Sequence, residues 1–301
     1  TPVGTILHTG DFKIDYTPID GETMDLQRIS NLGKEGVTLL MADSTNVERP
    51  GYTMSERTVG AGLDDLFRRA GDSRIIVATF SSNIHRLQQI IDMAKKCNRK
   101  VAISGRSMVN VIGVARELGY LDIEDEMLVD LNDISKYNDS ELVIITTGTQ
   151  GEPMSALARM ASSEHKKVEI KAGDLVIISA HPIPGNEKLI SKVINLLFEK
   201  GARVVYNDIA DIHVSGHASQ EELKLINVMA KPKFFMPVHG EYRMLKRHSE
   251  LAQEVGMPAE NIFVMQTGQV LELDKNSAKV TTTVPIGNVL VDGLGVGDVG
   301  N

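Results

Sequence analysis

Five acidic and imidazole side chains stand in turn-like settings at the ends of apolar runs. Asp11 lies in HTGDFK, Asp43 in LLMADSTN, His213 and His217 in HVSGHAS, and His239 in MPVHGEYRM. Loops that follow strands present their side chains to a cleft. A hydrolytic dinuclear zinc site uses these residue types, because a bridging carboxylate holds two ions and neutral imidazole nitrogens complete each shell. One histidine at a strand end is usually a satisfied polar group, so the prediction of such a site rests on the five together.

One further motif has the form of a dinucleotide-binding fingerprint. Residues 295–300, GVGDVG, satisfy the pattern GxGxxG. That fingerprint places a pyrophosphate at the N-terminus of a following helix and has an acid about 20 residues later. The printed chain stops at Asn301. We therefore interpret the motif as a glycine-rich turn.

The composition is that of a globular protein of about two domains. The chain has 301 residues, of which 42% are hydrophobic and 24% charged, and its net charge of -8 argues against a general nucleic-acid coat protein. Cys97 is the only cysteine, so no internal disulfide is expected. No segment resembles a signal peptide or reaches the roughly 20 apolar residues of a membrane span. We expect a cytoplasmic protein without a membrane partner.

Charge is distributed unevenly along the chain. Between Arg68 and Arg106, nine Lys or Arg residues stand against two acids, which is a net charge of +7. Between Tyr120 and Glu152, nine acids stand against Lys136 alone. Two interpretations stay open at this point. The stretches are either two solvated faces of opposite sign, or the basic one forms part of a nucleic-acid groove.

Secondary-structure elements must position the candidate residues. Along the chain, short apolar, β-branched runs alternate with longer amphipathic ones. This alternation is typical of α/β folds, in which helices cross a parallel sheet. The apolar stripes on the expected helices are core faces and need no cofactor. Strands are predicted for residues 37–42, 74–80, 100–104, 141–146, 175–179, 202–206 and 233–237, and helices for residues 83–97, 187–200 and 220–230.

The two ends of the chain differ from this middle. Residues 274–285 alternate polar and apolar side chains as a half-exposed antiparallel strand does, and HTGDFKID reads as a strand end that runs into a loop. The sheet type is therefore expected to change along the chain. Because Thr1 is not a methionine and a strand begins almost at once, we expect the numbered chain to start inside a domain.

Seven segments together resemble the ribonuclease J family. They follow the family's order over essentially the whole chain and read HTGDFKID, ADSTN, ATFSSNIHRLQQ, TTGTQGEPMSAL, PIPGNE, HVSGHAS and PVHGEYRML. The family belongs to the metallo-β-lactamase superfamily and carries an inserted β-CASP domain. The resemblance implies an α/β fold: part of an αββα metallo-β-lactamase domain, interrupted by a β-CASP domain with a parallel sheet flanked by helices. It assigns residues 1–54 to the first domain, 55–212 to the β-CASP domain, and 213–301 to the returning segment and the start of a C-terminal linker.

The resemblance also implies roles for individual residues. Asp11 matches the aspartate that bridges two zinc ions, and His239 matches the late histidine ligand of the second ion. Asp43 matches the first β-CASP acid and His217 the β-CASP histidine near the scissile phosphate, so these two are the implied catalytic residues. Asp292 matches a position that holds a structural calcium ion in some members. The implied phosphate-binding loop consists of His213, Val214, Ser215, Gly216, His217 and Ser219.

The chain departs from the superfamily in its remaining zinc ligands. Most of these ligands belong to an HxHxDH motif and a further histidine, all of which precede the TGD segment. None of the eight histidines of this chain forms an HxH pair. We therefore expect that part of the metallo-β-lactamase domain and the C-terminal domain of the family lie outside this chain. Alone, the chain is expected to be inactive, because Asp11 and His239 cannot complete two zinc sites.

For the complete protein, the resemblance implies an RNA phosphodiesterase with two Zn²⁺ ions per site and RNA as its partner. Its implied activities are 5′-to-3′ exonuclease and endonuclease cleavage in mRNA decay and rRNA processing, by a protein that forms homo-oligomers. The basic stretch then lines an RNA groove, to which His85, Arg86 and Arg106 are assigned. Whether His217 acts as a general acid or as a phosphate clamp stays open.

Two other functions are weighed against the nuclease. A non-catalytic module that binds nucleotides, phosphate or RNA agrees with the missing zinc motif, but it leaves Asp11, His217 and His239 without a reason to occur together. A metallo-hydrolase of small esters or lactams is disfavoured, because the β-CASP insertion accompanies nucleic-acid substrates. An HxHxDH motif encoded upstream of Thr1 would favour the nuclease.

Overall fold

The computed structural model describes residues 1–301 apart from 20–21, 181–184, 207–211, 288, 290, 293–294 and 297–301. The chain divides into two units. The first unit comprises Thr1–Ile14, Met24–Thr53 and Ser215–Asn301, and the second comprises Asp15–Thr23 and Met54–Val214. These divisions fall within two residues of the expected domain ends at 54 and 212, but the segment Asp15–Thr23 belongs to the second unit rather than to the first.

A parallel sheet forms the centre of the second unit, with the strand order β5-β4-β6-β3-β7-β8. All its strand pairs are parallel. Parallel strands covered on both faces are near-continuous apolar runs, and every residue of β3, β6 and β7 is buried. The strands are β3 (Ile75–Ala78), β4 (Lys100–Ser104), β5 (Leu128–Val129), β6 (Leu142–Thr146), β7 (Leu175–Ile178) and β8 (Arg203–Val205).

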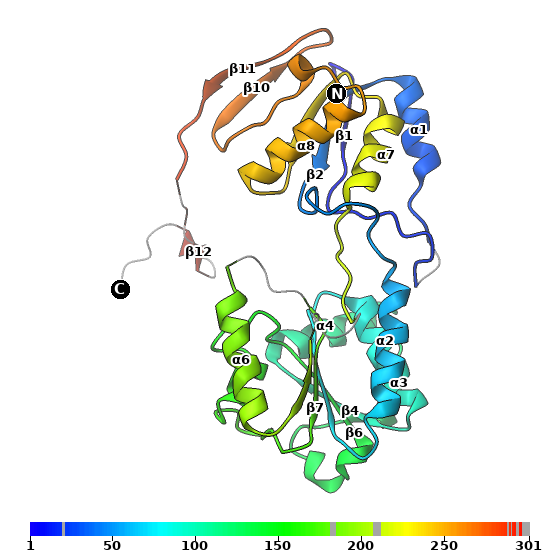
Figure 1. Ribbon diagram of the computed structural model, residues 1–301, viewed down its shortest axis with the longest axis vertical. Coiled ribbons are helices and arrows are strands. Elements are labelled where there is room, and N and C mark those ends of the chain that lie inside the picture. The colour runs from blue at the N-terminus through cyan, green and yellow to red at the C-terminus, as the bar shows by residue number, and fades with distance from the viewer. Residues whose placement is uncertain are drawn as a thin grey trace. The chain divides into compact units, whose positions relative to one another are not determined.

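Helices cover both faces of this sheet (Figure 1). Successive strand residues point to opposite faces, so Ile75 and Val77 enter one hydrophobic core while Ile76 enters the other. Helices α2, α3 and α4 contribute to the first core, and α5 and α6 to the second. Their bounds are α2 (Glu56–Arg69), α3 (Ile84–Lys96), α4 (Arg106–Glu117), α5 (Ala156–Ala161) and α6 (Glu187–Glu199), with short 3-10 helices at Asp125–Met127, Ile134–Lys136 and Asp139–Glu141.

A three-stranded parallel sheet of order β1-β2-β9 organises the first unit. Its core contains the fully buried side chains of Leu40 and Phe235. Gly33 lets helices α1 and α7 approach closely, because a Cβ at this position would lie 2.1 Å from the carbonyl oxygen of Met229. The elements are β1 (Thr5–His8), α1 (Leu26–Glu35), β2 (Val37–Asp43), α7 (Gln220–Ala230), β9 (Phe234–Val238), α8 (Tyr242–Glu254) and a 3-10 helix at Ala259–Asn261.

The C-terminal part of the first unit contains two antiparallel strand pairs. Strand β10 (Gln269–Leu273) pairs with β11 (Ala278–Thr283), and β12 (Val291–Asp292) pairs with β13 (Gly295–Val296). The antiparallel strand predicted within residues 274–285 is thereby confirmed. At the other end of the chain, β1 pairs in parallel with β2, so the sheet type changes only towards the C-terminus.

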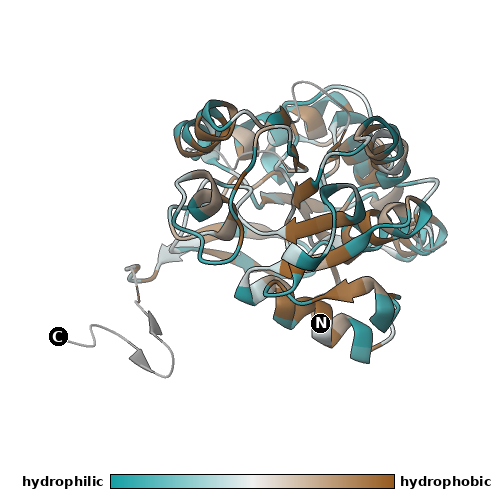
Figure 2. Ribbon diagram, turned by 90° about the horizontal axis from the view of Figure 1, so that it is seen from below, coloured by the Kyte–Doolittle hydropathy of each residue, from teal (hydrophilic) through white to brown (hydrophobic). Residues whose placement is uncertain are grey.

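The predicted α/β class, with parallel sheets flanked by helices, is confirmed. All seven predicted strands occur, with ends that differ by at most two residues, and the three predicted helices correspond to α3, α6 and α7. Helices α1, α2, α4, α5 and α8 were not predicted. Figure 2 shows hydrophobic strands surrounded by helices that carry hydrophilic segments. Among the described residues, no helix is both long and apolar enough to cross a membrane.

Candidate active site

Three neighbouring parallel strands of the first unit deliver three of the predicted site residues to one edge of the sheet. Asp43 is the last residue of β2, and it lies opposite Val238, the last residue of β9. His239 follows directly. Asp11 comes three residues after the end of β1, which pairs with β2. Ligands bind at the carboxyl ends of parallel strands in α/β folds, so the topology explains why residues distant in sequence meet here.

The fourth residue, His217, joins this edge from the loop that precedes α7. One ligand atom each from Asp11, Asp43, His217 and His239 lies within 4.8 Å of the others. Nδ1 of His217 lies 2.7 Å from Oδ2 of Asp43, and Nδ1 of His239 lies 3.2 Å from Oδ1 of the same carboxylate. Nε2 of His239 is 3.6 Å from Oδ1 of Asp11. The structure therefore brings four of the five predicted residues together, and His213 is not a member of this group.

The carboxylate of Asp43 is the buried centre of this group. Its side chain is 1% exposed, whereas those of Asp11 and His239 are more than half exposed. Burial raises the pKa of Asp43, but hydrogen bonds from His217 and Thr45 together outweigh that effect and lower the pKa to about 2. The hydrogen bond to Asp43 raises the pKa of His217 above its ordinary value, against the opposing effect of burial. The pair thus favours a carboxylate beside an imidazolium.

Thr45 orients Asp43, a role that the sequence analysis missed. Its backbone N–H and its hydroxyl both donate to Oδ1 of Asp43, at 3.0 and 2.8 Å. The same hydroxyl lies 2.8 Å from Nδ1 of His239. Thr9 adds a further contact, because its hydroxyl accepts a hydrogen bond from the backbone N–H of Asp43. The hydroxyl residues that follow Asp43 in ADSTN were the available signal, since such side chains bond to nearby groups in turns.

Two side chains hold the backbone of His217 in place. The amide of Asn46 donates to the carbonyl of His217 at 2.9 Å, and the hydroxyl of Thr53 donates to the same carbonyl at 2.8 Å. Asn46 also donates to Oγ of Ser215, which in turn accepts the backbone N–H of His217. The ring of His217 is stacked on that of His239, with centroids 5.3 Å apart. The position of this loop is therefore set by hydrogen bonds on both sides of His217.

The predicted phosphate-binding loop is only partly accessible. Gly216 is exposed, and His213, Ser215 and His217 are half-buried. The side chain of Val214 belongs to a hydrophobic core of the second unit. Ser219 is 4% exposed. These placements correct the prediction for the side chains of Val214 and Ser219, since the first is core and the second caps a helix.

The cap at Ser219 explains why its hydroxyl is occupied. It forms a capping box with Glu222 at the start of α7, and it lies 2.9 Å from the hydroxyl of Thr53. In such a box, the cap hydroxyl bonds to a backbone N–H of the first helical turn. The hydroxyl of Ser219 therefore stabilises the helix start rather than facing solvent.

The backbone of His239 adopts a conformation that is rare for residues with a side chain. Its φ is +55°, in the left-handed region. Single residues in this region cost of order 1–3 kcal/mol and are retained where the surroundings over-determine them, often at functional sites. Here the carbonyl of His239 accepts a hydrogen bond from the backbone N–H of Ser44 and lies 3.1 Å from the hydroxyl oxygen of Thr45. The β2 loop thus holds His239 in this conformation.

His248 supports the same loop from the buried side of helix α8. Its Nδ1 lies 2.9 Å from the hydroxyl of Ser44, and its ring packs edge-on against Phe235 with centroids 4.9 Å apart. Burial lowers the pKa of His248 to about 3, so its imidazole is neutral near pH 7. The sequence analysis assigned no role to this histidine, because it lies within a helix and away from any strand end.

Acidification is expected to destabilise the first unit through His248. Unfolding restores the pKa of an exposed histidine, about 6.5, so the unfolded chain binds an extra proton between pH 6.5 and about 3. The stabilisation is present above pH 6.5 and is lost as the pH falls. Between pH 7 and pH 5 the loss is about 2 kcal/mol. Denaturant unfolding at both pH values measures it, and His248→Gln should remove it, while His85→Gln in the second unit should not. Equal pH dependence in His248→Gln and the unaltered chain would contradict this assignment.

The structure corrects the assignment of Arg86 to an RNA groove. Its side chain is fully buried, its Nε donates to Oε1 of Glu56, and its Nη1 donates to the hydroxyl of Ser179 and to the carbonyl of Ile212. Arg86 therefore joins four segments of the second unit and has no access to a ligand. His85 and Arg106 are exposed, at the beginnings of α3 and α4.

Much of the basic stretch is occupied within the second unit. Arg74 is buried and forms an ion pair with Asp174, and Arg99 donates to the backbone carbonyls of Ser73 and Gly71. Lys95 pairs with Glu124 of the acidic stretch at 2.6 Å. The sequence count of +7 therefore overstates the positive charge that is free to meet a ligand.

Two remaining expectations concern the C-terminal segment. The side chain of Asp292, the predicted calcium ligand, lies outside the side chains that the structure describes. Gly295 lies in β13, and the later residues of the GxGxxG segment, from position 297 onward, lie outside the described residues.

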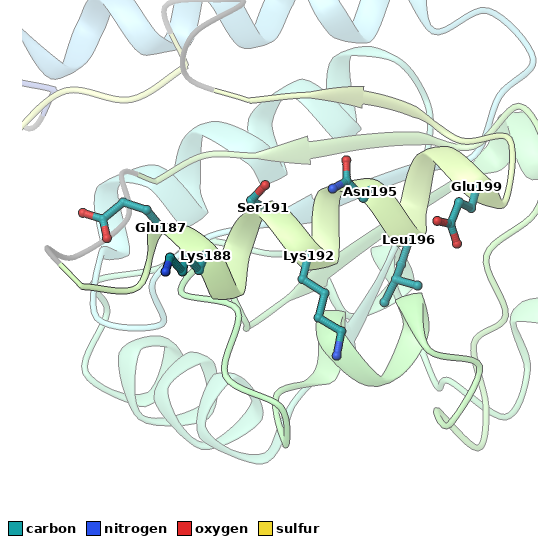
Figure 3. A pocket seen from close by; sticks show the side chains of 7 residues that line it. All are labelled: Glu187, Lys188, Ser191, Lys192, Asn195, Leu196 and Glu199. Atoms are coloured by element: carbon teal, nitrogen blue, oxygen red, sulfur yellow. The ribbon is translucent and has the colours of Figure 1, made fainter.

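A shallow hollow along α6 contains none of the predicted site residues (Figure 3). All its lining residues belong to this one helix: Glu187, Lys188, Ser191, Lys192, Asn195, Leu196 and Glu199. Of the residue types that commonly bind metal ions, this hollow contains only the glutamates Glu187 and Glu199, which lie at opposite ends of the helix. The hollow thus offers no alternative centre for the chemistry.

Comparison with known proteins agrees with this geometry. The family described as "Ribonuclease J, beta-CASP domain" matches residues 72–197, and the family described as "Zn-dependent metallo-hydrolase RNA specificity domain" matches residues 201–265. The chain is 46% identical over its whole length to Ribonuclease J2 of Bacillus subtilis, of which it covers 54%. It is 48% identical to Ribonuclease J of Synechocystis over 98% of its own length, and it covers 46% of that protein. It is also 48% identical to Ribonuclease J of Thermus thermophilus over 99% of its own length, and it covers 52% of that protein. It spans about half the length of these curated relatives. The chain belongs to the ribonuclease J family.

Proposed function

We propose that this chain forms part of a zinc-dependent nuclease that hydrolyses RNA phosphodiester bonds. The observation that carries the proposal is the convergence of Asp11, Asp43, His217 and His239 within 4.8 Å. Relatives that match over the whole chain are named ribonuclease J, and one matched family is described as a Zn-dependent metallo-hydrolase RNA specificity domain. The proposed activities of the complete protein are 5′-to-3′ exonuclease and endonuclease cleavage.

The donor set fits zinc. Two carboxylates and two imidazoles offer oxygen and nitrogen ligands, which zinc accepts in four-coordinate sites. Asp11 and His239 are the proposed ligands, because both are accessible and their nearest donor atoms are 3.6 Å apart. The described residues contain no second group of three or more such side chains. A second zinc ion in the complete site would therefore need ligands beyond this set. Calcium at Asp292 remains a prediction.

His217 is proposed to act on the scissile phosphate. Its Nδ1 is held by Asp43, which leaves Nε2 as the nitrogen that donates to a phosphate oxygen or to the leaving oxygen. The carboxylate of Asp43 raises the pKa of His217, which favours the protonated ring, and its bond to Nδ1 fixes the ring's orientation. When bound, zinc supplies a Lewis acid that polarises phosphoryl oxygens and activates water.

Ser215 is proposed to bind a phosphate oxygen. Its Oγ accepts hydrogen bonds from Asn46 and from the backbone N–H of His217. A hydroxyl has one hydrogen and two lone pairs, so with both lone pairs used the hydrogen is directed to an acceptor. Gly216 beside it is exposed, which allows close approach of a phosphate to the backbone.

His85 and Arg106 are proposed to contact RNA in the second unit. They lie in the segments that follow β3 and β4, the two strands that flank β6 in the parallel sheet. Both side chains are therefore presented at the carboxyl edge of the sheet, where α/β proteins bind ligands. Arg106 is exposed, in contrast to Arg74, Arg86 and Arg99.

Replacing Arg106 by Gln is expected to weaken binding of single-stranded RNA and to lower its salt dependence. A Lys or Arg that neutralises one phosphate of a single strand contributes about 0.7 to the log–log slope of affinity against salt. The slope should fall by that amount for unrelated sequences, as measured by a salt titration of RNA binding to the chain. Arg68→Gln is the control, because Arg68 is engaged with Asp64. A slope that does not change in Arg106→Gln would exclude this contact.

The nuclease proposal is tested by joining this chain to the remaining part of the Thermus thermophilus ribonuclease J. We expect the joined protein to hydrolyse single-stranded RNA, and a chelator to abolish the activity until zinc is restored. End-labelled substrates separate release of 5′ nucleotides from internal cleavage. The chain by itself should show little hydrolysis, because four donor groups do not complete a dinuclear site.

The competing function, a binding module without catalysis, is distinguished by the same protein. In that case the joined protein would fold, retain zinc and bind RNA, but would not hydrolyse it. That outcome would refute the nuclease proposal while leaving the Arg106 contact intact.

A further inference from the structure

A fully buried carboxylate, that of Glu222, lies in the first turn of helix α7. Its partners in the described structure are three backbone N–H groups and no cation. Oε1 accepts from Ile14 at 2.7 Å, and Oε2 accepts from Thr53 at 2.7 Å and from Ser219 at 2.8 Å. Donors on both oxygens match the acceptor-only chemistry of a carboxylate.

The capping of helix α7 explains only one of these bonds. In a capping box, the glutamate at the third helical position bonds to the backbone N–H of the cap residue, here Ser219. The bonds to Ile14 and Thr53 reach segments 208 and 169 positions away in sequence. An ordinary helix cap needs neither, so Glu222 has a second structural role.

Each of the two distant segments leads to the candidate active site. Ile14 is buried in the core of the first unit and lies three residues after Asp11. Thr53 donates its hydroxyl to the carbonyl of His217 and lies 2.9 Å from the hydroxyl of Ser219. One carboxylate therefore ties the Asp11 segment to the loop that carries His217.

We propose that Glu222 is a positioning residue of this site: it sets the Asp11 segment and the His217 loop relative to each other, acting through Thr53. The inference rests on the proposed function in so far as the site is taken to be catalytic. The contacts of Glu222 themselves do not depend on bound metal or RNA. Among the described residues no other side chain bonds to both Ile14 and Thr53, so loss of the Glu222 carboxylate should loosen the Asp43–His217 pair.

The test replaces Glu222 by Gln in the 301-residue chain, without metal or RNA and at one fixed pH. An amide has one acceptor oxygen and one NH₂ group, so one side of the new side chain would face backbone N–H groups with a donor. Ring nitrogen signals of the histidines are recorded by NMR. We expect the His217 signals to move towards the positions found in Asp43→Asn, which marks loss of the Asp43–His217 bond. The His165 and His85 signals, from the second unit, should stay unchanged.

The matched control is Glu221→Gln, one residue earlier in the same helix turn. Glu221 pairs with Lys224 and its side chain is 42% exposed. His217 signals should be unaffected there. Unchanged His217 signals in folded Glu222→Gln would refute the proposal, and so would equal shifts of all histidines, since these would indicate a general loss of structure.

A second pair of variants decides the matter if Glu222→Gln does not fold. Thr53→Val removes only the hydroxyl that bonds to the His217 carbonyl and keeps the backbone N–H that bonds to Glu222. Thr53→Ser keeps both. We expect the His217 signals to shift in Thr53→Val and to return in Thr53→Ser. His217 signals of Thr53→Val at their original positions would refute the proposed route.

Zinc affinity tests the proposed role of Glu222 independently. Partners that orient metal ligands typically contribute 10- to 100-fold in affinity. Zinc binding by the joined nuclease should therefore weaken by about 10-fold or more in Glu222→Gln and not in Glu221→Gln. Failure of RNA hydrolysis in the joined protein would count against the nuclease, whereas the NMR result concerns Glu222 alone.

Discussion

Replacing Asp43 by Asn is expected to lower RNA hydrolysis by the joined ribonuclease J about 100-fold or more. The carboxylate of Asp43 contacts Nδ1 of both His217 and His239 and accepts two hydrogen bonds from Thr45. An amide of the same shape cannot accept on both of its polar atoms, and it removes the negative charge that stabilises the imidazolium. One substitution thus disturbs the orientation and the protonation of His217 together.

The pH dependence of the reaction carries a second signature of Asp43. The bond to Asp43 raises the pKa of His217, so the protonated ring persists to higher pH than an ordinary histidine allows. Without the carboxylate, the pKa of His217 should be lower, so the ring loses its proton at a lower pH. The high-pH decline of the rate should therefore move to lower pH in Asp43→Asn, if the protonated ring acts on the phosphate.

The measurement is the initial rate of hydrolysis over a pH series, with zinc saturating. Asp65→Asn is the matched control, because Asp65 is a surface residue paired with Arg69. Its rate and pH profile should equal those of the unaltered protein. A folded Asp43→Asn protein with undiminished rate would show that this carboxylate is not part of the active site.

Replacing Arg86 by Met is expected to lower the free energy of unfolding of the second unit by about 3–5 kcal/mol. The guanidinium is fully buried and pairs with Glu56, whose side chain is only 13% exposed. Removing one partner of a buried ion pair leaves the other charge without compensation. The hydroxyl of Ser179 also loses the hydrogen bond from Arg86, whereas the carbonyl of Ile212 loses the bond from Arg86 and keeps that from the Ser179 hydroxyl.

Denaturant unfolding, followed by signals from the second unit, measures this loss. The double variant Arg86→Met with Glu56→Gln should recover part of it, because no uncompensated charge then remains. Arg68→Met serves as the control, since Arg68 is exposed and its partner Asp64 also pairs with Lys96, so the loss of Arg68 should change stability little. An Arg86→Met chain as stable as the control would show that Arg86 is dispensable for the fold.

The strands of the two parallel sheets could largely be predicted from the amino-acid sequence. A buried parallel strand is a short, continuous apolar run, which is why the strands at 75–78, 142–146 and 175–178 were predicted to within two residues at each end. Helices α2 and α8 were missed, because their sequences are polar, with only a narrow apolar stripe, and they become helices through packing against the sheets. Local pattern is a weak guide where tertiary contacts supply most of the stability.

The identities of the central site residues were predicted from the sequence as well. Asp11, Asp43 and His239 follow strands, and parallel topology sends the ends of neighbouring strands to one edge. His217 was a candidate from its setting in HVSGHAS as well, and the family resemblance added its expected role near the scissile phosphate. These predictions depend on residue type and position along the chain, both of which a sequence states directly.

Only the tertiary structure decided how the charged residues are used. In the sequence, Arg86 and Arg106 count equally towards a basic stretch, yet Arg86 is enclosed by Glu56, Ser179 and Ile212, and Arg106 faces solvent. Glu222 likewise reads as one more acid of an amphipathic helix, although its carboxylate joins segments 208 and 169 positions away. Burial and long-range hydrogen bonds depend on which segments meet in space. Local periodicity and charge counts contain no such information, so the roles of these side chains emerged only from the folded chain.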